Sequence, residues 1–348
     1  MELLPLLVLD PTEPAILPGE RRRLLLTEER MVTAVRLALR DGGRLAVLAW
    51  DPAQRREGEG ATAPDVERLL PVATACRLIR GEVEGFAVVR GEARVVVAGT
   101  SSGGCCDHDD PYAEGTEARC EPFPSSGGDE AAWEDLAALL RSLDLPVHVR
   151  AGAPLEARID RVARALALVP WVQAEVLAAG ELAVRIRRLA DAAVEMAAPG
   201  ASFRASELDA PYRSAEEHLE DLVRCWDLRA RAIEAAGMVE EDRHEALVRG
   251  ERILRRRRAA ALRVRAVEAR RRRRLQASAA AGALPPLERI RAAHGLDCRE
   301  VDALLAAGLG SHERFAARVQ RAARLLPPAE MPLAAWIEAL EAGAFPAG

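Results

Sequence analysis

Leu4-Pro5-Leu6-Leu7-Val8-Leu9, followed closely by Ile16-Leu17-Pro18-Gly19, is the stretch that decides the fold of the first third of the chain. A short apolar run bounded by turn residues is typical of a buried β-strand. Pro18-Gly19 indicates a turn, because proline holds φ near its ring-fixed value and glycine accepts the conformation that follows. The two segments together predict a sheet domain.

The same texture continues to about residue 122 and then changes. Thr27–Arg40 interrupts the strands with a helix, because Met31, Val35 and Ala38 recur at helical spacing and Thr27 is suited to the N-cap. The other β-type runs are Leu24–Leu26, Leu45–Trp50, Ala73–Arg80, Gly85–Val89, Ala93–Ala98 and Glu117–Pro122. Residues 52–64 and 99–115 are predicted loops, and Gly81, Gly85 and Gly91 indicate hairpin turns.

After residue 128 the hydrophobic spacing is helical almost throughout. Ser214-Ala-Glu-Glu217 has the spacing of a capping box and opens one of the longer helices. The predicted helices span 131–143, 155–168, 214–236, 239–278, 287–294, 299–307, 312–325 and 333–342. The fold class is therefore α+β, a small β-barrel or sheet domain with one helix followed by a mostly α-helical region.

These textures and the charge pattern predict four regions. Residues 1–128 form the sheet domain, 129–248 a helical bundle, 249–280 a long arginine-rich helix and 281–348 a small helical tail.

Composition excludes several kinds of chemistry. The chain has 348 residues, and all 49 of its Lys+Arg residues are arginine. Without lysine it has no P-loop lysine, no Schiff base and no Ser–Lys dyad. Six cysteines are too few and uneven for a disulfide scaffold, which favours reduced thiols. With no signal-peptide pattern and no long apolar span, the expectation is a cytoplasmic protein without membrane contact.

The order of motifs in the first ~120 residues resembles the Lon protease N-terminal domain, which is PUA-like and binds substrates. Leu4–Leu9 is similar to the family's opening strand, and Ile16–Gly19 to its hydrophobic-Pro-Gly turn. Val72–Ile79, Gly85–Val97 and Glu117–Pro122 are similar to its later strands. The family-motif positions on this chain are Pro5, Leu6, Pro18, Gly19, Gly85, Gly91 and Arg94.

The resemblance implies a non-catalytic polypeptide-recognition or adaptor protein that needs no cofactor, because nothing here resembles the family's ATPase or protease parts. Its implied partners are unfolded or client polypeptides and a separate protease, and the helical region is a candidate for self-association. A nucleic-acid or polyanion-binding protein is the alternative. Arg94 lies one residue off the alternation of its apolar neighbours, which favours a solvated arginine and leaves a role in holding an acid as the other interpretation.

Two motifs between residues 99 and 120 have weak chemical signals. Cys105, Cys106, His108 and Cys120 are the only metal-like cluster, but adjacent cysteines fit one zinc tetrahedron poorly, so a thiol-bearing loop is favoured. Gly99–Gly103 has the G-x-S-x-G spacing around Ser101. A nucleophile elbow needs a helix directly after the serine, and a loop-like stretch follows here, so a hydrolase is disfavoured.

The arginine-rich segment stands out from an acidic chain. Residues 249–274 carry 13 arginines against Glu251 and Glu268, a net charge of +11. Two interpretations stay open: ion pairs with acids of this chain such as Glu216, Glu217, Glu220 and Asp221, or salt-sensitive, sequence-independent contact with polyanions. The candidate residues are Arg255, Arg256, Arg257, Arg258, Arg270, Arg271, Arg272, Arg273 and Arg274.

Residues 290–306 have the spacing of a helix-turn-helix. The second predicted helix, from Arg299, is acidic and apolar, which suits a major groove poorly. Packing as a helical hairpin is the favoured interpretation.

Overall fold

The computed structural model describes most of the first 296 residues. The described ranges are 1–9, 13–26, 28–50, 69–83, 85–102, 116–150, 152–198, 208–236, 243–296 and residue 301. The fold is mixed α+β, as the sequence predicted.

Six strands form the N-terminal sheet, in the order β2-β5-β4-β3-β1-β6. The strands are β1 (Glu2–Val8), β2 (Arg21–Leu25), β3 (Arg44–Leu48), β4 (Val72–Val83), β5 (Phe86–Ser102) and β6 (Thr116–Pro122). β1 and β3 are parallel, and the other pairs are antiparallel. A second pairing, between β5 and β6, closes five of the strands into a ring.

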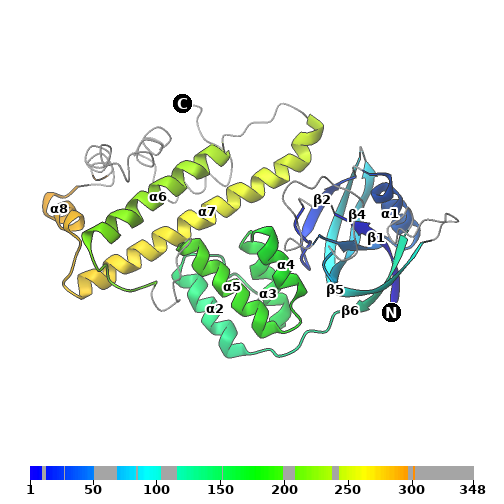
Figure 1. Ribbon diagram of the computed structural model, residues 1–348, viewed down its shortest axis with the longest axis horizontal. Coiled ribbons are helices and arrows are strands. Elements are labelled where there is room, and N and C mark those ends of the chain that lie inside the picture. Colours follow the sequence, from blue (N-terminus) through cyan, green and yellow to red (C-terminus); the bar gives the residue numbers. More distant parts are fainter. Residues whose placement is uncertain are drawn as a thin grey trace. The chain divides into compact units, whose positions relative to one another are not determined.

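β2 is an addition to this ring. It pairs with the first residues of β5, whereas β6 pairs with the later residues of that long strand. Figure 1 shows β2 beside the closed part of the sheet. Among the residues that the structure describes, β2 has no other strand partner, so its second edge is an edge of the sheet.

The helix α1 (Glu29–Arg40) packs against β1, β3 and β4 (Figure 1). Its buried residues are Met31, Ala34, Val35 and Ala38, which is the face predicted from the helical spacing. Leu6 lies in the cluster inside the ring, while Leu7 is also buried. Because β1 is buried on both faces, its sequence is a continuous apolar run instead of an alternating one.

Among the residues that the structure describes, seven further helices follow the sheet. They are α2 (Glu130–Ser142), α3 (Leu155–Ala165), α4 (Pro170–Ala178), α5 (Leu182–Ala197), α6 (Ala215–Ala236), α7 (Arg243–Ala280) and α8 (Pro286–His294). α6 and α7 run side by side (Figure 1). Leu222, Val223 and Trp226 of α6 are buried in a cluster against which Leu287 of α8 packs. At the start of α6, Ser214 accepts a hydrogen bond from the backbone N–H of Glu217, as the capping box predicted. The helices predicted beyond residue 301 lie outside the described residues.

Three local predictions were wrong. The N-cap of α1 is Glu28, not Thr27. The runs predicted as two strands around Gly91 form one strand, β5, and Gly91 sits at a register shift within it. Residues 99–102, predicted as loop, continue β5, where Ser101 lies opposite Glu117. In the two cases on β5, pairing with β4 and β6 decides the local conformation.

The chain divides into two compact units. One holds residues 1–136 and 148–189, and the other holds 137–147 and 190–348. The first unit thus contains α3 and α4 as well as the sheet. The boundaries predicted from sequence at 128, 248 and 280 stay a prediction.

No helix in the described part of the chain is long and apolar enough to cross a membrane.

Candidate functional site

Five of the seven family-motif positions gather at two places on the sheet. Pro5 and Leu6 lie on β1, opposite Glu117 and Ala46. The turn at Pro18 and Gly19 meets Gly91, because the Gly19 N–H donates to the Gly91 carbonyl over 2.8 Å.

Steric requirements explain why glycine occupies two of the family-motif positions. Gly85 turns the chain between β4 and β5 with a φ of +79°, a region that favours glycine. A Cβ on Gly91 would lie 2.5 Å from the Leu17 carbonyl oxygen. Gly91 therefore serves a close approach of two backbones, and the hairpin turn predicted there is absent from the described strand.

Arg94 is buried, so the favoured prediction of a solvated arginine was wrong. Its guanidinium donates to Glu156 Oε1 on α3 over 2.9 Å and to Ser125 Oγ over 2.5 Å. It also donates to the carbonyls of Leu177 and Ala179, at the end of α4, over 3.0 and 2.6 Å. The face of β5 that sequence alternation assigned to solvent is covered by helices, and the alternative role of holding an acid is the one observed.

A second buried arginine, Arg185 on α5, extends this junction. It pairs with the carboxylate of Asp160 on α3, and burial raises the pKa of that carboxyl. Burial would also raise the pKa of Glu156, but hydrogen bonds from Ser125 and Arg94 hold it below its ordinary value. The junction keeps opposite charges together and fixes α3, α4 and α5 to the sheet within the first unit.

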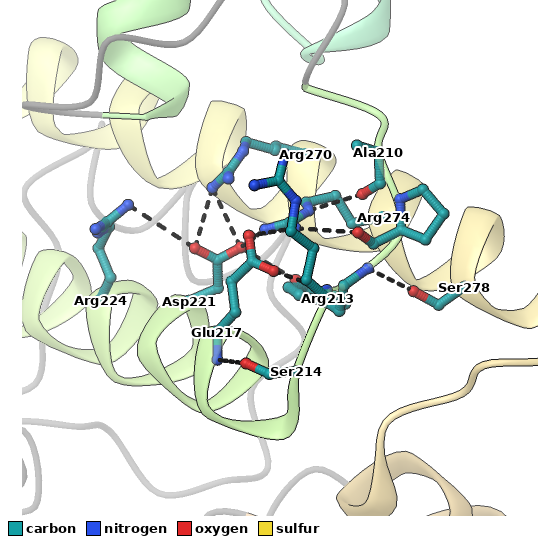
Figure 2. A network of polar contacts seen from close by, with 11 residues as sticks. Ala210, Arg213, Ser214, Glu217, Asp221, Arg224, Arg270, Arg274 and Ser278 are labelled. Atoms are coloured by element: carbon teal, nitrogen blue, oxygen red, sulfur yellow. Dashed lines mark hydrogen bonds and ion pairs between the residues drawn. The ribbon is translucent and has the colours of Figure 1, made fainter.

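The arginines Arg270–Arg274 of α7 lie within ion-pairing distance of carboxylates. Figure 2 shows the centre of this network, where Asp221 on α6 accepts from Arg270 over 3.0 Å and from Arg274 over 3.1 Å. Arg274 also donates to Glu217 over 2.6 Å. The remaining partners are Glu268 and Glu288 for Arg271, Asp144 for Arg272 and Asp209 for Arg273.

For Arg270–Arg274, this network agrees with the interpretation that the arginines form ion pairs with acids of the same chain. Glu217 and Asp221 are two of the acids predicted as partners. Arg270 and Arg274 are buried, and Arg274 stacks over the ring of Tyr212 at 4.0 Å. A buried guanidinium that already bonds a carboxylate offers little to an external phosphate.

The first cluster, Arg255–Arg258, lies on the same helix in a different setting. Arg256 and Arg258 are exposed, and Arg255 and Arg257 are half-buried. The structure thus separates two clusters that the sequence treats alike, and polyanion contact stays a prediction for the first.

The predicted metal cluster lies mainly outside the described residues, which do not include Cys105, Cys106 or His108. Cys120 is buried within the ring of strands, and burial raises the pKa of its thiol to about 11. No group of three metal-ligating side chains occurs among the described residues.

Sequence reasoning missed a row of arginines that lies across one face of the sheet. Arg21 on β2 lies opposite Arg90 on β5, which lies opposite Arg77 on β4, which lies opposite Arg44 on β3. The sequence does not indicate this row, because the four arginines become neighbours only through the register of four strands.

Two comparisons with known proteins match parts of this chain. Residues 202–314 match the model of a winged helix domain, variant. The N-terminal domain of the Mycobacterium avium complex Lon protease is 19% identical, with a TM-score of 0.41, over 55% of this chain and 97% of its own.

The Lon N-terminal domain protein from Xanthomonas campestris is 20% identical, with a TM-score of 0.35, over 54% of this chain and 97% of its own. No curated protein matches this chain. The chain thus resembles Lon N-terminal domains over about 55% of its length, which is the resemblance predicted from the motifs.

Proposed function

We propose that this chain is a non-catalytic protein that recognises polypeptides through the edge strand β2 of its sheet. The observation that carries the proposal is the second edge of β2, which has no strand partner among the described residues. An extended polypeptide can add to such an edge by main-chain hydrogen bonds. The motifs of residues 3–122 that resemble a substrate-binding domain support the same function.

The hydrogen bonds of β2 indicate which backbone groups face outward. Leu26 donates its N–H to Gly85, and Glu20 accepts from the N–H of Gly91, so the even-numbered positions bond to β5. Backbone groups of an antiparallel strand alternate in direction, so those of Arg21 and Leu25 point toward the free edge. These groups are the ones that a client strand would meet.

The test uses the full chain and a labelled client, reduced and carbamidomethylated α-lactalbumin, which cannot refold. Wild type is expected to bind it in fluorescence anisotropy, whereas folded α-lactalbumin is not. Leu25→Pro removes one outward N–H, a change that an edge strand tolerates, and is expected to weaken binding about ten-fold or more.

Arg21→Pro is a second variant that removes a different outward N–H, and circular dichroism checks that both variants fold. Wild-type affinity in both folded variants, or no binding by wild type, would overturn the proposal.

A polyanion-binding function remains the alternative prediction, and it concerns Arg255–Arg258. Replacing these four residues with glutamine is expected to remove any salt-dependent retention of DNA or RNA.

A further inference from the structure

The four arginines of the row point to the same side of the sheet. Residues that lie directly opposite one another on neighbouring strands share a face, and like charges in that arrangement destabilise the sheet. Arg21, Arg90 and Arg77 are exposed and Arg44 is half-buried, so this part of the face is open to solvent. A row of four equal charges across four strands therefore calls for compensating anions.

The chain supplies those anions to one half of the row. Glu92 accepts from Arg77 Nε over 2.7 Å and from Arg44 Nε over 3.0 Å, and Arg44 also pairs with Glu2. Burial would raise the pKa of Glu92, but these two arginines hold it below its ordinary value. The half of the row on β4 and β3 is thus neutralised within the chain.

The other half, on β2 and β5, has no such compensation. Within the described part of the chain, neither Arg21 nor Arg90 forms an ion pair with a carboxylate.

Further positive charge lies nearby on α3. Burial lowers the pKa of Arg164, Asp160 and Glu20 raise it, and the positive charges of Arg161 and Arg90 lower it again, which places Arg90 near the guanidinium of Arg164. The guanidinium of Arg164 donates to the Pro18 carbonyl, close to the start of β2. The face at the free edge of the sheet is consequently cationic.

We propose that the face formed by Arg21 and Arg90 binds acidic segments of polypeptide clients, with Asp or Glu at alternate positions of a strand added to β2. This inference rests on the proposed function and specifies its substrate class.

The geometry of strand addition accounts for the alternate spacing. Every second side chain of an added strand lies on the same face as Arg21, next to it, and strands in a sheet are about 4.8 Å apart. Arg90 is therefore about 10 Å from the added strand, a gap that extended arginine and glutamate side chains span together. A guanidinium group can donate two parallel hydrogen bonds to one carboxylate, so the contact has a preferred geometry as well as charge attraction.

The test compares two labelled peptides of equal length, built on alternating valine, one with glutamate at the other positions and one with glutamine. The full chain is expected to bind the glutamate peptide about ten-fold more tightly at about 50 mM salt, and the difference is expected to shrink at about 500 mM. Arg21→Gln with Arg90→Gln is expected to make the two peptides bind equally.

Arg119→Gln is the matched control, because Arg119 is an exposed arginine on β6 of the same sheet and lies opposite Leu3 and Gly99, not arginine. It is expected to keep the full preference for glutamate. The Arg21/Arg90 double variant is expected to keep or raise the melting temperature, since it removes a pair of opposed like charges. A loss of binding with an intact melting temperature therefore reports on the surface and not on folding.

The outcomes separate this inference from the proposed function. Equal affinity of wild type for both peptides overturns the inference and leaves strand addition standing. No binding of either peptide overturns both. If a single-stranded oligo-dT binds more tightly than the glutamate peptide and the double variant abolishes that binding, the face reads phosphates of nucleic acid and the inference is wrong.

Discussion

At the residue scale, two positions on β5 allow little change of side chain. Gly91 and Arg94 lie three residues apart on β5, and each joins the strand to a segment far away in sequence. Gly91 admits the Leu17 carbonyl, and Arg94 bonds α3 and the end of α4. Neither role shows in the local sequence, because both depend on what packs against β5.

Gly91→Ala is expected to lower the free energy of unfolding by about 1–3 kcal/mol, because its Cβ would force the Leu17 backbone aside. Gly99→Ala on the same strand is the control, since its Cβ would meet nothing within 4 Å. Urea unfolding followed by circular dichroism measures both. Equal stability of the two variants would show that the close approach is not limiting.

At the scale of elements, the packing of α6 against α7 depends on shared charges. Asp221 forms ion pairs with both Arg270 and Arg274, and all three side chains are buried. By contrast, Asp209 and Arg273 pair at the surface, with side chains 47% and 40% exposed. The two pairs use arginines of the same helix, so they form a matched comparison of buried and exposed contacts.

Asp221→Asn is expected to cost about 3–5 kcal/mol, because it removes the carboxylate that the buried Arg270 and Arg274 share and breaks both of these buried ion pairs. Asp209→Asn is expected to change stability by at most about 1 kcal/mol, as for other exposed pairs. Thermal unfolding of the full chain distinguishes them. A cost at Asp221 no larger than that at Asp209 would contradict the role given to the buried network.

At the scale of the whole molecule, the first compact unit extends past the sheet. Arg94 needs acceptors at 156, 177 and 179, and the side-chain amide of Gln173 donates to Ala15 over 2.5 Å. A fragment of residues 1–128 lacks all of these groups. A fragment of residues 1–189 contains them.

The 1–128 fragment is expected to be less stable than the 1–189 fragment by about 3–5 kcal/mol, at about 1 kcal/mol for each of the four hydrogen bonds that residues 156–179 make with Arg94 and Ala15. Urea titrations of both fragments, read by circular dichroism, give the difference. An equal or higher midpoint for 1–128 would support the division at residue 128 predicted from sequence.

Acid is expected to destabilise the whole chain. Burial would raise the pKa of Glu268, but Arg229 and Arg271 hold it below its ordinary value of 4.5, and the pKa of Glu156 is lowered as well. The unfolded carboxyls then bind protons more readily than the folded ones, so their stabilisation is present above pH 4.5 and is lost as the pH falls through the folded pKa values.

Asp160 changes the stability with pH in the opposite direction. Burial raises the pKa of its carboxyl, so the folded state binds this proton more readily than the unfolded state does. Urea unfolding at a series of pH values below 5 is expected to show a falling free energy, with a shallower slope in Glu268→Gln. A free energy that rises on acidification would mean that the raised carboxyl outweighs the lowered ones.

The sequence by itself determined most of the described elements of this protein and their order, although it did not predict α4 and α5. The run at Leu4–Leu9, the Pro18-Gly19 turn, the amphipathic α1 and the capping box of α6 are local signals, because each depends on neighbours within one strand or helix. Only the tertiary structure decided that Arg94 is buried, that Arg270 and Arg274 bond Asp221, and that Arg21 and Arg90 face each other. The reason is physical, since burial and strand register bring together residues that lie tens of positions apart, and no local pattern encodes which side chain arrives opposite.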